Sequence, residues 1–245
     1  MKNANLHLRI NMNQKERNSD NITSSAFPYL LSIFCSIIIL GNIYALKITT
    51  IFGMLTPSGM ICFPFTFSIC DIITEAYGEE AADRAIKTGL VVLIIYFISL
   101  QLVTYLDPAP GWQNQHAWET IFASSPRIIA GTFLAYYLGE KINSKLLAFL
   151  NDLFNGKFFL RRSIASTFTG VFIDTIVFNF IAFFGNFPIR YWVIFTCQQL
   201  ILKMLFELFG SYIASLIVPY LVKYENLDST KPGSWIAKYW KQKST

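Results

Sequence analysis

The stretch FPFTFSICDIITEAYGEE, from Phe63 to Glu80, decides the fold. It begins as an apolar segment without a charged residue and then places Asp71 and Glu75 four residues apart. Residues at that spacing lie on one side of a helix, so both carboxylates share one face. Ionisable groups in such apolar helices usually face the interior of a membrane bundle or a wet cavity.

The composition agrees with a membrane protein. The chain has 245 residues, of which 53% are hydrophobic and only 14% are charged. Soluble domains carry about 25% charged residues, so this chain is too apolar to fold in water. Its apolar residues also come in blocks of about 20, the length that spans a bilayer. The sequence therefore predicts an all-α, polytopic membrane protein.

Hydropathy and breaker residues predict six transmembrane helices in one domain, residues 27–222. Pro64 and Pro126 each either kink a helix or begin one. We expect residues 1–26 to be a polar, disordered tail rather than a cleaved signal peptide, and residues 223–245 to be a basic tail. The predicted spans are Phe27–Ile48, Ser58–Tyr77, Ala85–Tyr105, Trp118–Ile142, Ser163–Phe184 and Trp192–Val222.

The basic residues predict the orientation. With a cytoplasmic N-terminus, sixteen of the twenty Lys and Arg residues lie on the cytoplasmic side and only Lys47 and Arg190 lie outside. The positive-inside rule therefore places both termini in the cytoplasm. The same distribution explains the net charge of +5 without a nucleic-acid partner.

Three spans each carry one polar stripe. Asp71 and Glu75 share a face, Gln199, Lys203 and Glu207 recur every four residues, and a stripe of small and polar residues ends at Asp174. Either Lys203 and Glu207 form a plain ion pair or they line a cavity, and Glu75 is near enough to the cytoplasmic interface to be solvated. Asp71 and Asp174 have no cation in their own spans, which favours a functional role.

The two aspartates share a local pattern, F-T-x4-D-x-I, which begins at Phe65 and again at Phe168. Each lies in the second span of a three-helix half, so the halves would run in opposite directions. This predicts a 3+3 inverted repeat with a substrate site between the halves. Asp71 and Asp174 would then face one shared cavity.

Four blocks resemble the queuosine precursor transporters, a family of bacterial six-helix inner-membrane proteins. They are FPFTFSICDIITEAYG, PRIIAGTFLAYYLGEKI, ASTFTGVFIDTIVFNFIAFF and QLILKMLFELFGSYIASLIVPY. The resemblance covers roughly residues 28–222 and implies import of 7-cyano- or 7-aminomethyl-7-deazaguanine, or of queuine. It also implies that Asn42, Arg127 and the carboxylates and lysine of the polar stripes occupy the family's polar positions.

The chemistry of a guanine-type base fits these residues. A carboxylate can accept its ring N–H and exocyclic amine, side chains such as Asn42 or Arg127 can donate to its acceptors, and one of several phenylalanines can stack on its face. The candidate substrate-binding residues are Asn42, Phe67, Asp71, Glu75, Arg127, Asp174, Gln199, Lys203 and Glu207. We expect no cofactor, no metal site and no catalytic residue, since the two histidines, His7 and His116, lie away from the buried acids.

Two other functions stay open on the sequence. The chain could be the substrate-capture subunit of an ATP-driven importer, whose ATPase would be a separate protein. An intramembrane enzyme would need a nucleophile and a base, which the spans lack. Neither the energy source nor the choice between monomer and homodimer follows from the sequence.

The orientation can be tested by labelling. A cysteine introduced into Leu106–Ala117 should react with a membrane-impermeant reagent added to the periplasmic side, because this loop contains no Lys or Arg and is predicted outside. Labelling that occurs only after permeabilisation would reverse the orientation.

Overall fold

The computed structural model describes residues 26–123, 126–186 and 188–225. The two predicted tails lie outside these residues except at their inner ends, so their disorder stays a prediction. The elements in chain order are α2 (Phe27–Ala45), β1 (Ile48–Ile51), β2 (Met54–Pro57), η1 (Ser58–Ile61), α3 (Phe63–Tyr77), α4 (Glu79–Thr104), α5 (Gln115–Phe122), α6 (Pro126–Phe154), α7 (Phe159–Phe183) and α8 (Ile189–Tyr224).

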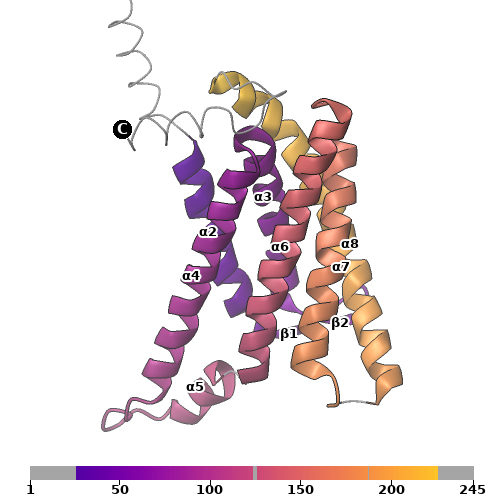
Figure 1. Ribbon diagram of the computed structural model, residues 1–245. Helices are drawn as coiled ribbons and strands as arrows, with labels where there is room; N and C mark the ends of the chain where they lie inside the picture. The colour runs from indigo at the N-terminus through magenta and orange to yellow at the C-terminus, as the bar shows by residue number, and fades with distance from the viewer. Residues whose placement is uncertain (1–25, 124–125, 187, 226–245) are drawn as a thin grey trace, which may run out of the picture.

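The long helices form one bundle in which successive helices alternate in direction (Figure 1). The start of α2 and the end of α8 lie at the same end, where the Ala26 backbone N–H donates to the Glu225 carboxylate. α3 and α7, which carry the two copies of the repeat pattern, run in opposite directions (Figure 1). The orientation of the bundle relative to the cytoplasm stays a prediction.

Within the described part of the chain, five helical segments are long and apolar enough to cross a membrane: α2, η1 with α3, α4, α7 and α8. α6 has 29 residues and lies beside them (Figure 1), but Arg127, Glu140 and Lys141 interrupt its apolar sequence. The prediction of an all-α, multi-pass membrane protein is thus confirmed. The count of six spans stays a prediction.

Both prolines begin helices. Pro64 lies in the first turn of α3, where its missing N–H removes no helical hydrogen bond. The prediction of one continuous span from Trp118 to Ile142 was wrong, because Trp118 belongs to the separate short helix α5 and α6 begins only at Pro126. A proline fits the first turn of a helix, where its missing N–H removes no helical hydrogen bond, and Pro126 accordingly begins α6.

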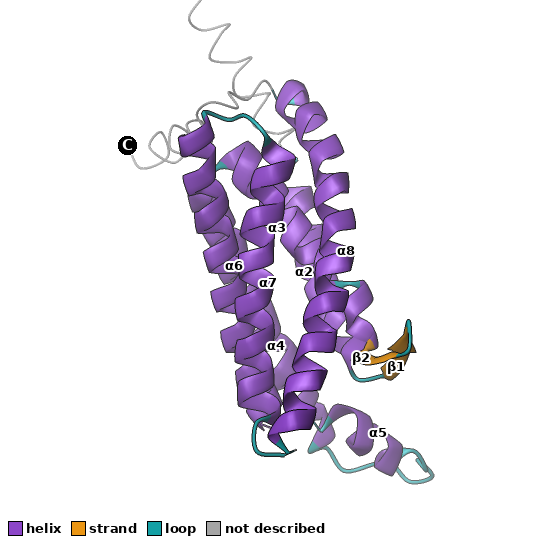
Figure 2. Cartoon of the chain, turned by 90° about the vertical axis from the view of Figure 1, so that its right-hand side faces the viewer, coloured by secondary structure: helices purple, strands orange, loops and turns teal. Residues whose placement is uncertain are grey.

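The sequence analysis missed a β-hairpin. The predicted first span reached Ile48, but α2 ends at Ala45 and β1 then pairs antiparallel with β2. Phe52 and Gly53 form the two-residue turn with φ angles of 51° and 78°, as a hairpin turn with left-handed residues requires. Figure 2 shows the hairpin and α5 at the end of the bundle opposite the α6–α7 turn.

α3 is the central helix. About 72% of its membrane-length apolar stretch is buried, compared with 22–33% for the corresponding stretches of α2, α4, α7 and α8. Those four helices present apolar side chains outward, such as Ile95, Ile98 and Leu102 of α4. Polar groups on α3 therefore face other helices and not lipid.

α6 and α7 pack with their backbones in close contact. A Cβ placed on Gly139 of α6 would lie 2.8 Å from the Asp174 Cβ, and one placed on Gly170 of α7 would lie 2.9 Å from the Gly139 carbonyl oxygen. Small residues of this kind let membrane helices approach closely. α6 and α7 thus form one tightly packed pair.

Gly139→Ala should lower the free energy of unfolding of the detergent-solubilised protein by about 1–3 kcal/mol, and with it the melting temperature, because the added methyl group forces α6 and α7 apart. Gly131→Ala on the same helix is the matched control, since its Cβ would meet its nearest atoms at an ordinary 3.4 Å. Equal melting temperatures for the two variants would contradict the close packing.

Candidate functional site

The helices enclose a cavity of about 500 Å³, which we call the central cavity. Its size is within the range of small-molecule sites, and its walls are mainly aromatic and aliphatic. The aromatic residues that line it include Phe63, Phe67, Tyr96, Tyr136 and Phe178, from α3, α4, α6 and α7.

The central cavity lies toward one end of the bundle. Its lining includes Ile48 and Pro57 of the hairpin and Thr120 and Ile121 of α5. Both elements lie at the end opposite the α6–α7 turn (Figure 2). The cavity therefore reaches from this end toward the middle of the bundle.

An ion pair between two helices forms part of the wall. Lys203 Nζ of α8 lies 2.6 Å from Asp174 Oδ2 of α7, and it lies 5.9 Å from the centre of the Phe63 ring. The sequence left open whether Lys203 pairs with Glu207 or lines a cavity; the structure pairs it with Asp174 and places it at the cavity wall. Asp174 is the acceptor because α7 packs against α8 at this level.

Five of the nine predicted binding residues line the central cavity: Asn42, Phe67, Asp174, Gln199 and Lys203. The Gln199 side chain is buried, and its Nε2 has no hydrogen-bond partner among the described residues. An amide donor without a partner at a cavity wall can serve a bound molecule. The role of these five lining residues in binding stays a proposal.

Asp71 does not line the central cavity. Its fully buried carboxylate accepts hydrogen bonds from Asn143 Nδ2 at 2.7 Å, from Thr167 Oγ1 at 3.0 Å and from the Ser163 hydroxyl. The Ser211 hydroxyl of α8 lies 3.1 Å from that of Ser163. The expectation that Asp71 and Asp174 face one cavity was wrong, because side chains of α6 and α7 enclose Asp71.

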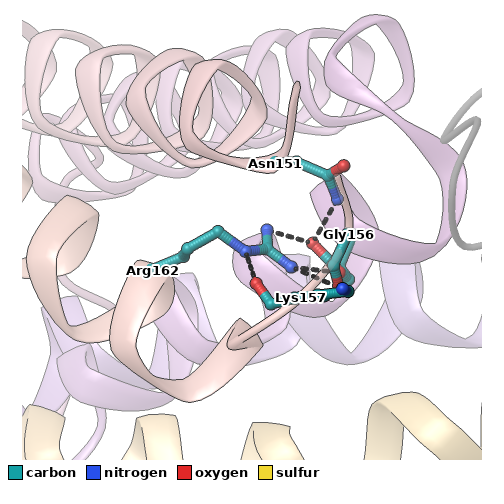
Figure 3. Close-up of polar contacts among 5 residues, drawn as sticks. Asn151, Gly156, Lys157 and Arg162 are labelled. Atoms are coloured by element: carbon teal, nitrogen blue, oxygen red, sulfur yellow. Dashed lines mark hydrogen bonds and ion pairs between the residues drawn. The ribbon is translucent and has the colours of Figure 1, made fainter. Parts of the chain in front are cut away.

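Glu75 forms a buried ion pair with Arg162. The two guanidinium nitrogens lie 2.8 and 2.7 Å from the two carboxylate oxygens, and Asn151 donates to the same carboxylate at 3.0 Å. Arg162 also donates to the carbonyls of Lys157 and Gly156 in the α6–α7 turn (Figure 3). The sequence analysis counted Arg162 among the cytoplasmic basic residues and considered Glu75 near enough to the interface to be solvated. In the structure both side chains are buried, with Arg162 1% exposed and Glu75 3% exposed.

The remaining two predicted residues lie elsewhere. The Arg127 guanidinium donates to the carbonyls of Ile181 and Phe184, at 3.0 and 2.8 Å, and so caps the end of α7. Glu207 lies beside Thr167 and Ser211, in a separate small cavity of about 10 Å³. Neither residue lines the central cavity.

The sequence analysis missed Glu140. It is 1% exposed, lines the central cavity, and neither carboxylate oxygen has a hydrogen-bond partner among the described residues. The adjacent Lys141 made this position resemble the polar end of a span. A signal was present, because Ile128, Thr132, Tyr136 and Glu140 recur every four residues and all line the cavity.

The protein family described as "Putative vitamin uptake transporter" matches residues 57–217. The chain belongs to this family. The matched segment includes the central helix α3, the α6–α7 pair and most of α8, and hence both buried polar networks and most of the central cavity's wall; the part of the wall from α2 and β1, with Asn42, precedes it.

Two named proteins are similar to the chain. A "Probable queuosine precursor transporter" of Bacillus subtilis is 25% identical over 183 residues, covering 73% of this chain and 80% of that protein. The "Queuosine precursor transporter" of Escherichia coli is 26% identical over 169 residues, covering 67% and 74%. No solved structure matches the chain. The resemblance indicated by the four sequence blocks is thus confirmed.

The Glu75–Arg162 pair predicts a large stability effect. Glu75→Leu and Arg162→Met should each lower the free energy of unfolding by about 3–5 kcal/mol, because each leaves a buried charge without its partner. The double variant should melt at a higher temperature than either single one, since it removes both charges. As a control, Asp83→Asn should cost only about 0.2–1 kcal/mol, because Asp83 pairs with Lys87 and Lys141 near the surface. A double variant less stable than both single variants would contradict the pairing.

Proposed function

We propose that this chain imports queuosine precursors, the 7-deazaguanines or queuine, across the bacterial inner membrane with both termini in the cytoplasm. Its membership of a vitamin uptake family and the names of the two relatives support transport as the activity and these compounds as the cargo. We further propose that the activity is transport alone, without catalysis.

The observation that carries this proposal is the central cavity. A flat heteroaromatic base needs aromatic walls for its faces and a few polar groups for its edge. The cavity of about 500 Å³ offers aromatic walls from Phe63, Phe67 and Tyr136, among others. Asn42, Gln199 and the Asp174–Lys203 pair supply polar groups on the same walls.

Lys203 has the geometry to orient such a base. Its ammonium group already donates to Asp174 and keeps further N–H donors for a carbonyl oxygen in the cavity. Because Asp174 fixes the position of the ammonium group, less side-chain freedom is lost when a substrate binds. We therefore assign Lys203 to the substrate carbonyl and Asp174 to the positioning of Lys203.

The position of the cavity favours an alternating-access mechanism. The cavity lies in the hairpin and α5 half of the bundle, and the polar networks of Asp71 and Glu75 join the helices in the other half. With the predicted orientation, this conformation faces the periplasm. Release into the cytoplasm would require α3 to separate from the α6–α7 pair at these two networks. Asp71 and Glu75 then act as a cytoplasmic gate and not as substrate ligands.

Uptake in cells that cannot make queuosine tests the proposal, with queuosine in tRNA as the readout after each precursor is supplied. Cells that express this chain should gain queuosine, whereas Lys203→Ala should lower the initial uptake rate about tenfold or more, because it removes a substrate donor and leaves Asp174 unpaired. Lys87→Gln is the control, since it removes an exposed lysine that does not line the cavity.

The host should lack the membrane modules of ATP-driven vitamin importers. Uptake in such a host excludes a role as a capture subunit that depends on a partner ATPase. If no precursor yields queuosine although the protein is in the membrane, the proposed cargo is wrong.

A further inference from the structure

Glu140 is a buried acid without a protein partner at the wall of the central cavity. The residue is 1% exposed, and neither Oε1 nor Oε2 has a hydrogen-bond partner of normal geometry among the described residues, although the Cys70 thiol and the Thr66 hydroxyl lie close to it. A buried carboxylate without donors is costly, so such groups are rare unless a ligand completes them. This site therefore needs donors from the cavity.

The side chains closest to Glu140 cannot supply strong donors. The Thr66 hydroxyl donates its only hydrogen to the Phe63 carbonyl at 2.7 Å. The Cys70 thiol, which lies beside the carboxylate, is a weak donor. Lys141, the next residue, turns away and pairs with Asp83.

The other cations of the bundle interior are already paired. Lys203 binds Asp174, and Arg162 binds both oxygens of Glu75. On the wall of the same cavity, the Gln199 amide has the opposite deficiency, because its buried Nε2 donor has no acceptor among the described residues. The walls thus present one unpaired acceptor group on α6 and one unpaired donor on α8.

We propose that Glu140 is the residue that reads the substrate's donor edge, the adjacent ring N–H and exocyclic amine of a 2-amino-4-oxo-pyrimidine ring. The two carboxylate oxygens match two parallel N–H donors, and the Gln199 amide, with Lys203, donates to the carbonyl on the same ring. This inference rests on the proposed function and assigns to Glu140 the contact that the sequence had assigned to Asp71. Glu140 then selects guanine-type bases over bases without the amine.

Binding to the purified full-length protein tests this assignment, with two ligands: 7-cyano-7-deazaguanine and the analogue that lacks only the exocyclic amine. The wild type should prefer the first compound by roughly 10-fold to 100-fold, as expected for a hydrogen bond to a charged group. Glu140→Gln should lose most of this preference through weaker binding of the amine-bearing compound, because an amide offers only one acceptor atom.

Glu207→Gln is the matched control. Glu207 is also a buried carboxylate of the bundle with one unpartnered oxygen, but it lies in the separate small cavity. This variant should keep the wild-type preference. The melting temperature of ligand-free Glu140→Gln should equal or exceed that of the wild type, because a carboxyl group without strong donors has been removed from the interior.

A wild type that binds the first compound, together with a Glu140→Gln variant that keeps the full preference, would overturn the assignment alone. A wild type that binds neither compound would overturn both the assignment and the proposed function. If Glu140→Gln does not fold, the wild type is tested with the ring-N-methylated compound. Binding at least tenfold weaker supports the assignment, and unchanged binding rejects it.

Discussion

The ion pair between Glu75 and Arg162 sets the register of the central helix against the α6–α7 pair. Charges in an apolar interior persist only with good partners, and this pair is bidentate and completed by Asn151 and two turn carbonyls. Asp71 lies one turn before Glu75, and Ser163 follows Arg162, so the same register brings Asp71 to its own donors. One contact thus aligns two polar networks in the bundle interior, where a buried polar group without a partner would strongly destabilise the fold.

The two buried carboxylates of α3 differ from Glu140 and Gln199 in how they are satisfied. Near the α6–α7 turn, Asp71 and Glu75 each accept three hydrogen bonds from protein side chains. In the cavity half, Glu140 and the Gln199 amide lack partners among the described residues. Satisfied networks hold helices together, whereas unsatisfied groups at a cavity wall provide for a ligand. This contrast separates residues that the sequence had grouped as one substrate-binding set.

Composition and spacing were enough to predict the helical membrane fold and the polar face of α3. They could not choose partners between helices, because the pairing of Lys203 with Asp174 and not Glu207 depends on how α7 and α8 pack. Arg162 was misassigned for a related reason, since a cation near a predicted loop reads as solvated although its helix begins at Phe159, before the apolar stretch. Glu140 was hidden by its neighbour Lys141. The hairpin was missed although ITTIFGMLTP shows β-branched residues around a Phe-Gly turn.

The close contact between Gly139 and Gly170 also bears on how the protein is made. α6 carries Arg127, Glu140 and Lys141, and by itself it is not apolar enough to qualify as a membrane span, whereas α7 is. A charged residue at the centre of a helix costs about 2.5–3.5 kcal/mol on insertion scales. We therefore expect α6 to enter the bilayer together with α7, as a helical hairpin whose glycine contact forms inside the translocation machinery. The glycines would then matter first for biogenesis, before any substrate reaches the finished transporter.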